Sequence, residues 1–177
     1  RRFAHCLALL AALLIGCQSA ETPPTIGLLG QLQQRAERGD VDAQLTLAAS
    51  YLEGTNGLAM NRSQAVHWFE AAAAQGSAQA QFTLGALTER TGPRPNLAKA
   101  ADHYRAAANQ GHGPALSRLG LLYLRGQGVR QDHAQARSLM RRAAARGGAE
   151  EQFAYAVTLS AASESTEAAR WLLAAAE

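Results

Sequence analysis

Apolar residues recur along the chain at spacings that place them on one face of successive helices. Gly39, Gly76, Gly111 and Gly147 lie 37, 35 and 36 residues apart. A large apolar residue stands eight positions after each glycine and a small one nine positions after it: Leu47 and Ala48, Leu84 and Gly85, Leu119 and Gly120, Tyr155 and Ala156. Because residues four apart share a helix face, this spacing predicts a helix after each glycine, with a small residue where another helix approaches closely.

A second helix is predicted to end just before each of the later glycines. Alanines stand eleven and four residues before Gly76, Gly111 and Gly147, with large side chains between them. These large pairs are Trp68-Phe69, His103-Tyr104 and Leu139-Met140, and Trp171-Leu172 occupies the corresponding place in the last copy. Glycine suits the left-handed backbone conformation that often closes a helix, so each glycine is expected to separate two helices.

Helix pairs that match at this period predict an all-α fold, an α-solenoid of about four helix-turn-helix repeats. The repeats cover about residues 39–75, 76–110, 111–146 and 147–177, and residues 26–38 form one extra helix before them. A single pair cannot bury its apolar face, so the pairs are expected to stack.

The third repeat carries a motif that resembles a known family. It reads Ala115-x-x-x-Leu119-Gly120-x-x-Tyr123, followed by Gly126-Gln-Gly128-Val129 and Ala143-Ala144-x-x-Gly147. This pattern resembles the Sel-like repeat, a relative of the tetratricopeptide repeat, and the resemblance covers roughly residues 39–177. The second and fourth copies replace or shorten the glycine loop. The resemblance implies a scaffold for protein–protein contact, with no catalytic residues to carry over.

Residues 1–25 are predicted to direct the chain to a membrane. Arg1 and Arg2 precede an apolar run that fits a signal peptide and is too short to span a bilayer. The tetrad Leu14-Ile15-Gly16-Cys17 resembles the bacterial lipobox, which implies a signal peptide at residues 1–16 and lipid attachment at Cys17. Residues 17–25 are then a flexible tether before the solenoid at 26–177. An ordinary cleaved signal with an incidental cysteine is the alternative.

Charge and motif content argue against nucleic-acid binding, metal binding and catalysis as functions of this chain. Without residues 1–16 the chain holds 15 basic and 14 acidic side chains, too small an excess for a general nucleic-acid binder. The remaining histidines form no metal-ligand motif, and no nucleophile elbow or phosphate-binding loop occurs. We therefore expect no catalytic residue, metal or cofactor, and an envelope hydrolase is the least favoured function.

The third repeat is strongly basic. Residues 111–146 hold seven basic side chains and one acidic, whereas residues 39–75 and 147–177 are net acidic. Arginine pairs with carboxylates and stacks on aromatic rings, which suits a binding surface. Positions 7, 11 and 14 after each glycine share a face of the first helix, which by analogy with the family lines the concave surface. The predicted partner contacts there are Arg118, Arg125, Arg90, Leu87 and Leu122, and a solvated face is the alternative.

These features predict a non-enzymatic protein-interaction scaffold, anchored by lipid at the periplasmic face of the bacterial envelope. Gln18 differs from the aspartate that commonly retains such lipoproteins at the inner membrane, so the resemblance implies the outer membrane. The expected partners are envelope or periplasmic proteins with an acidic patch, and the chain alone is expected to be monomeric. An immunity-type lipoprotein that inhibits a periplasmic toxic effector is the alternative, because some lipoproteins that resemble these repeats have that role.

Overall fold

The computed structural model describes residues 24–90, 95–146 and 149–161, together with residues 170, 171, 173 and 176. In that part the chain forms eight helices and no β-strand, which confirms the predicted all-α fold. The helices are α2 (Pro24–Glu37), α3 (Val41–Glu53), α4 (Arg62–Ala74), α5 (Ala78–Glu89), α6 (Leu97–Asn109), α7 (Gly113–Arg125), α8 (His133–Ala144) and α9 (Ala149–Ala161). The predicted signal peptide and Cys17 lie outside the described residues.

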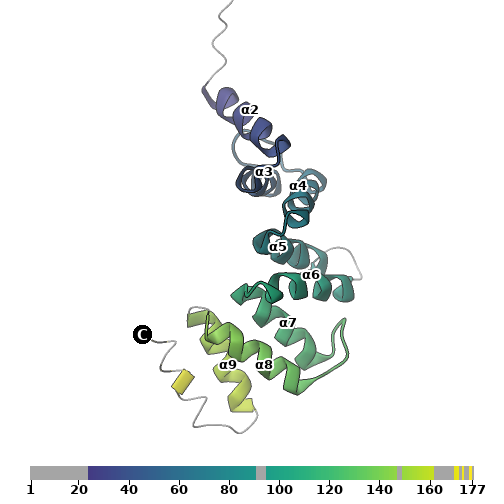
Figure 1. The fold of residues 1–177 in the computed structure, drawn as a ribbon, viewed down its shortest axis with the longest axis vertical. Helices are drawn as coiled ribbons and strands as arrows, with labels where there is room; N and C mark the ends of the chain where they lie inside the picture. Colours follow the sequence, from purple (N-terminus) through teal and green to yellow (C-terminus); the bar gives the residue numbers. More distant parts are fainter. Residues whose placement is uncertain are drawn as a thin grey trace, which may run out of the picture.

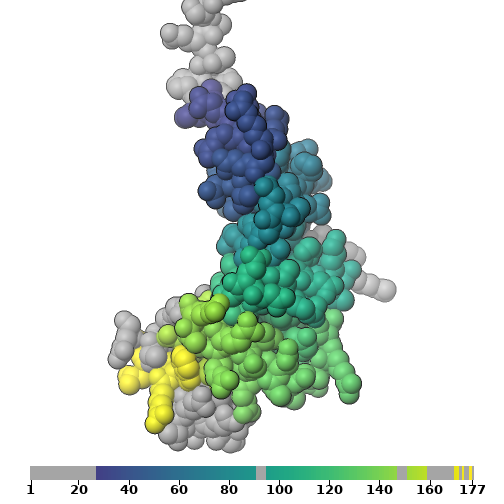
Figure 2. Space-filling model, viewed as in Figure 1, coloured from purple at the N-terminus to yellow at the C-terminus, as the bar shows by residue number. Residues whose placement is uncertain are grey.

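The helices form a curved stack of pairs, in which each helix packs mainly on its neighbours in the sequence (Figure 1). The pairs are α3 with α4, α5 with α6, and α7 with α8, and α9 begins a fourth. Helix α2 is the predicted extra helix, but it starts at Pro24, inside the segment expected to be a tether. Figure 2 shows an elongated body that is narrow at its N-terminal end and wider where α6 to α9 pack.

The fourth pair is only partly described. Its predicted loop at residues 162–167 and most of its predicted second helix lie outside the described residues. The ring of Trp171, however, lies edge-on to the ring of Tyr155 on α9, with centroids 5.5 Å apart. Tyr155 is 1% exposed, so this tryptophan packs on the core, as the repeat pattern predicts. Among the described helices, none has the length and apolarity that crossing a bilayer would require.

The small residue at position nine allows the two helices of a pair to approach closely. A Cβ atom added to Gly85 on α5 would lie 2.7 Å from two ring carbons of Tyr104 on α6. One added to Gly120 on α7 would lie 2.8 Å from Cγ of Met140 on α8. Tyr104 and Met140 are buried, and an alanine could not be accommodated without moving them.

The first helices of the three complete pairs start with a turn and a cap at the repeat glycine. Gly39, Gly76 and Gly111 have φ angles of 91°, 88° and 81°, which confirms the predicted left-handed conformation at these three positions. Gly147 lies outside the described residues. The next residue caps the following helix: Asp40 Oδ1, Ser77 Oγ and His112 Nδ1 each accept a hydrogen bond from the backbone N–H three residues on, at 3.1, 3.3 and 3.3 Å.

Candidate protein-binding surface

The first helix of each complete pair presents a line of exposed and half-buried side chains. On α7 the exposed residues Arg118 and Arg125 lie seven apart, which places them nearly in line along the helix. We call the equivalent positions of the three complete pairs the first-helix stripe. It consists of Asp42, Thr46, Ala49 and Glu53 on α3, Gln79, Thr83, Ala86 and Arg90 at α5, and Pro114, Arg118, Leu121 and Arg125 on α7. All are exposed or half-buried.

Two of the five predicted contact residues do not belong to this stripe. Leu122 is 3% exposed and packs in the core cluster of α6, α7 and α8, so the prediction that it forms the apolar centre of a binding strip is wrong. Position 11 lies about 40° further round the helix than position 7, on the side that faces the core. The same position on α3, Ser50, is 2% exposed. Leu87 is half-buried and packs on the core cluster of α3, α4 and α5.

The charge of the stripe changes along the stack. Its α3 part carries Asp42 and Glu53, its α5 part ends at Arg90, and its α7 part carries Arg118 and Arg125. In Figure 1, α3 and α5 lie on the side toward which the lower end of the stack bends. The stripe thus presents an acidic region near one end and a basic region near the other.

A buried tyrosine places an acid next to the basic end of the stripe. The Tyr104 hydroxyl donates a 2.6 Å hydrogen bond to Glu89 Oε2. Burial raises the pKa of Tyr104, the carboxylate of Glu89 raises it further, and the positive charge of Arg118 acts in the opposite direction. Glu89 and Arg118 therefore lie near the same hydroxyl group. Sequence reasoning missed this contact because Phe69 and Met140, which occupy the position of Tyr104 in the neighbouring repeats, have no hydroxyl.

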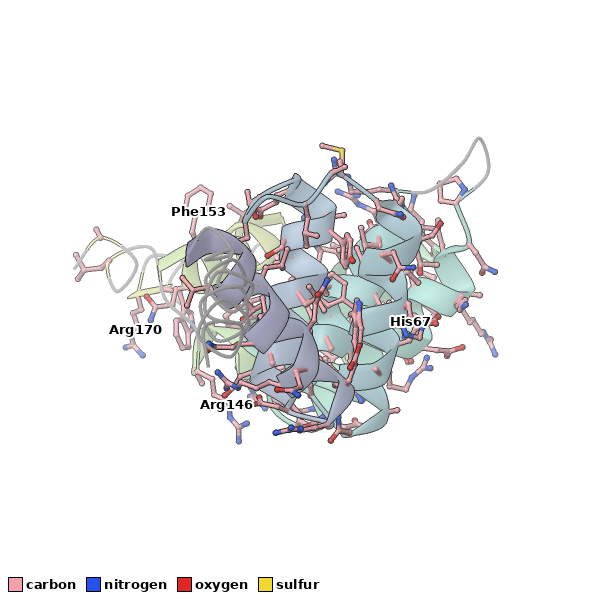
Figure 3. All side chains as sticks on the ribbon, turned by 90° about the horizontal axis from the view of Figure 1, so that it is seen from above. His67, Arg146, Phe153 and Arg170 are labelled. Carbon is pink, nitrogen blue, oxygen red and sulfur yellow. The ribbon has the colours of Figure 1, made fainter. Side chains whose placement is uncertain are left out.

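The seven arginines of the third repeat belong to different elements of the structure. Only Arg118 and Arg125 belong to α7, whereas Arg137, Arg141 and Arg142 belong to α8. Viewed along the stack, Arg146 lies at one edge of the molecule, well away from His67 on the opposite side (Figure 3). The excess of positive charge seen in the sequence is divided between α7, α8 and the segments that follow these helices.

Arg142 belongs to a set of hydrogen bonds that joins successive pairs. Gln44 on α3 donates to the carbonyl oxygen of Ala36 near the end of α2, at 3.0 Å. Gln81 on α5 donates in the same way to the carbonyl oxygen of Ala73 near the end of α4, at 3.5 Å. Arg142 on α8 donates to the carbonyl oxygen of Ala108, which has the equivalent position on α6, at 3.4 Å. Sequence reasoning also missed this feature, although glutamine does recur five positions after the repeat glycine.

Each of these two glutamines is itself held by a second one. Gln75 donates to Gln44 Oε1 at 2.9 Å, and Gln110 donates to Gln81 Oε1 at 2.8 Å. In the third repeat a leucine, Leu116, replaces the glutamine and is fully buried. These side chains therefore serve the stacking of the pairs.

The described histidines have separate structural surroundings. His67 contacts the edge of Trp68 at 5.1 Å between ring centroids, His112 caps α7, and His133 begins α8. Burial lowers the pKa of His103, and the charge of Lys99 lowers it further. Within the residues that the structure describes, no three His, Cys, Asp or Glu side chains gather as metal ligands would.

The Sel1 repeat matches residues 41–77, 78–112 and 113–148 of this chain. A protective antigen of uropathogenic Escherichia coli with an SLR fold is 38% identical, with a TM-score of 0.67 over 80% of this chain and 30% of that one. A Sel1 repeat protein from Oxalobacter formigenes is 33% identical, with a TM-score of 0.66 over 72% of this chain and 96% of that one.

Two further comparisons concern more distant proteins. An immunity protein from Pseudomonas aeruginosa is 20% identical, with a TM-score of 0.57 over 97% of this chain and 64% of that one, a likeness of fold. Chitin synthase regulatory factor 4 from Schizosaccharomyces pombe is 38% identical over 49% of this chain, and the match spans only 13% of that protein. With three matched repeats over most of the described helices, the chain belongs to the Sel1-repeat family.

Proposed function

We propose that this chain is a non-enzymatic scaffold, held by lipid at the periplasmic face of the bacterial outer membrane, which binds an envelope protein through the basic end of its first-helix stripe. Sel1-repeat proteins are protein-interaction scaffolds. The observation that carries the proposal is the alignment of Arg118 and Arg125 on α7, with Arg90 at the place equivalent to Arg125. None of these three guanidinium groups forms an ion pair with another residue of the described part of the chain.

The partner surface that fits this arrangement is acidic. Arginine binds carboxylates through two parallel hydrogen bonds, and its planar group stacks on aromatic rings. An interfacial arginine that loses its water on binding often contributes more than about 1 kcal/mol when truncated. The acidic α3 part of the stripe would then face a basic or neutral part of the same partner.

Crosslinking and pull-down from envelope fractions tests the binding site. We expect the double variant Arg118→Ala, Arg125→Ala to capture much less partner at about physiological salt, with unchanged helicity by circular dichroism. Arg141→Ala, Arg146→Ala removes the same charge from α8 and the turn that follows it, outside the stripe, and is the matched control. Equal loss in both double variants would show that only the net charge matters, and full capture by the first would contradict the proposed site.

The lipid anchor has its own test. Mass spectrometry of protein extracted from membranes should find a mature chain that starts at an acylated Cys17, and Cys17→Ser should leave the precursor unprocessed. A soluble chain with an unmodified N-terminus at another residue would contradict the anchor. The identity of the captured partner then separates an assembly scaffold from an immunity-type inhibitor: a secreted toxic effector whose activity this chain abolishes would establish the inhibitor.

A further inference from the structure

A groove of about 560 Å³ lies between the second helices of the first two pairs. One wall is α4, the other is α6, and the floor is formed by α5, which Figure 1 shows between them. Val66, Leu84 and Leu87 make the apolar part of its lining. No residue of the first-helix stripe lines it, so the groove is a separate surface from the one proposed above.

The two ends of the groove differ in charge. Arg62 is the first residue of α4, and its guanidinium donates a 3.0 Å hydrogen bond to the carbonyl oxygen of Leu87, which holds it at the groove edge. Lys99 lies in the first turn of α6, so both cations are near the start of their helices. Glu70 lines the groove eight residues further along α4, about 12 Å from Arg62 at 1.5 Å per residue.

The walls face each other closely enough for their charges to interact. His103 on α6 lines the groove. Burial lowers the pKa of His103 most and Lys99 on its own helix lowers it further, while Glu70 on α4 and Asp102 on α6 act in the opposite direction. Lys99 and Glu70 are exposed, and neither side chain forms an ion pair with another described residue. The groove therefore has an apolar middle, a basic end and an acidic end, and the charges of Lys99 and Glu70 are available to a ligand.

The shape and length of the groove suit a segment of polypeptide. Sites that hold small molecules commonly enclose most of the ligand surface, whereas five of the residues that line this groove are exposed. An extended chain advances about 3.3 Å per residue, so about four residues cover 12 Å.

We propose that this groove binds a short extended segment of a partner protein, with aliphatic side chains between an acidic residue at one end and a basic residue at the other. The aliphatic side chains contact Val66 and Leu87, the acidic residue pairs with Lys99, and the basic residue pairs with Glu70. The groove is thus a second interaction surface, which the chain can use together with the first-helix stripe or without it.

Fluorescence anisotropy with short labelled peptides tests the proposal on the whole protein. The probes carry two to four aliphatic residues between Asp and Lys, and the comparison peptides carry serine in the middle, Asp at both ends, or Lys at both ends. We expect the Asp–Lys peptides to bind best. Lys99→Glu should weaken their binding about tenfold, because an attraction becomes a repulsion.

Glu70→Lys provides a gain of binding that damaged folding could not produce. This variant makes both ends of the groove basic, so its preference should change to the peptide with Asp at both ends. Arg118→Ala, Arg125→Ala should bind all peptides as the wild type does, which separates this groove from the stripe. The proposal is overturned if the Asp–Lys peptides bind no better than the serine peptide, or if Glu70→Lys leaves the preference unchanged.

Discussion

Protonation of His112 should weaken the start of α7. Nδ1 of His112 accepts the hydrogen bond from the N–H of Ala115 at 3.3 Å, so in this arrangement the ring proton is on Nε2, which faces Gln79 Oε1 at 3.2 Å. A second proton would have to bind Nδ1 and would remove the cap. The positive charge would also lie at the N-terminus of a helix, where the helix dipole disfavours it.

The sign of the pH effect follows from the direction of the pKa shift. Burial lowers the pKa of His112 below its ordinary value of 6.5, while the charge of Glu151 on α9 acts in the opposite direction. The other groups around the ring, Gln79 and Phe82 on α5, do not titrate. Below pH 6.5 the unfolded chain therefore binds more protons than the folded one. The free energy of unfolding falls as the pH drops through the folded pKa and then becomes constant.

The expected loss is about 1 kcal/mol, the usual contribution of a helix N-cap. Urea unfolding at pH 7.5 and at pH 5 measures it, with His112→Ser as the comparison. Serine occupies the equivalent position, Ser77, and caps α5 without titrating, so the variant keeps a cap at both pH values. His103 titrates in both proteins and cancels. If the wild type and His112→Ser lose the same stability on acidification, the reasoning about Nδ1 is refuted.

Three other substitutions test the packing of the stack by urea unfolding. Gly85→Ala should destabilise the protein by about 1–3 kcal/mol, because its methyl group would lie against Tyr104. Gly30→Ala is the control and should be neutral or stabilising, because a Cβ atom at Gly30 has no neighbouring atom within 4 Å. Equal effects of the two substitutions would contradict the packing argument. Tyr104→Phe should lower the free energy of unfolding by about 1 kcal/mol, since Glu89 loses its 2.6 Å hydrogen bond. An unchanged free energy of unfolding would show that water replaces the hydroxyl group. Gln44→Ala should lower the free energy of unfolding by about 1–3 kcal/mol, because the carbonyl oxygen of the buried Ala36 loses its hydrogen bond, whereas the exposed Gln75 can bond to water instead. A neutral result would exclude a role of Gln44 in stacking.

The repeat itself could be predicted from the sequence because it depends on features that every copy must keep. Left-handed glycines such as Gly76 and close helix contacts such as that at Gly85 restrict the residue type, so the sequence shows them directly. The binding surface was harder to predict. Whether Leu122 is buried depends on a rotation of about 40° around the helix, which periodicity does not resolve.

Side-chain contacts between repeats could not be predicted from the period. The hydrogen bond from Tyr104 to Glu89 depends on one hydroxyl group that the neighbouring copies lack. The role of Arg142 depends on Leu116 having replaced a glutamine and on a long side chain that reaches from another helix. Both require the relative positions of two pairs, which are set only when the pairs stack.

The hydrogen bonds between pairs have a mechanical consequence. At the first two junctions a short glutamine side chain, held by a second glutamine, fixes the end of one helix to the next pair. At the third junction this link is the long side chain of Arg142, with Leu116 in place of the glutamine. Because repeats in such a stack contact only their neighbours, elastic deformation is distributed according to the stiffness of each junction. Of these three junctions, the one between α6 and α8 should therefore bend most easily, and the stack could change its curvature there without unwinding a helix.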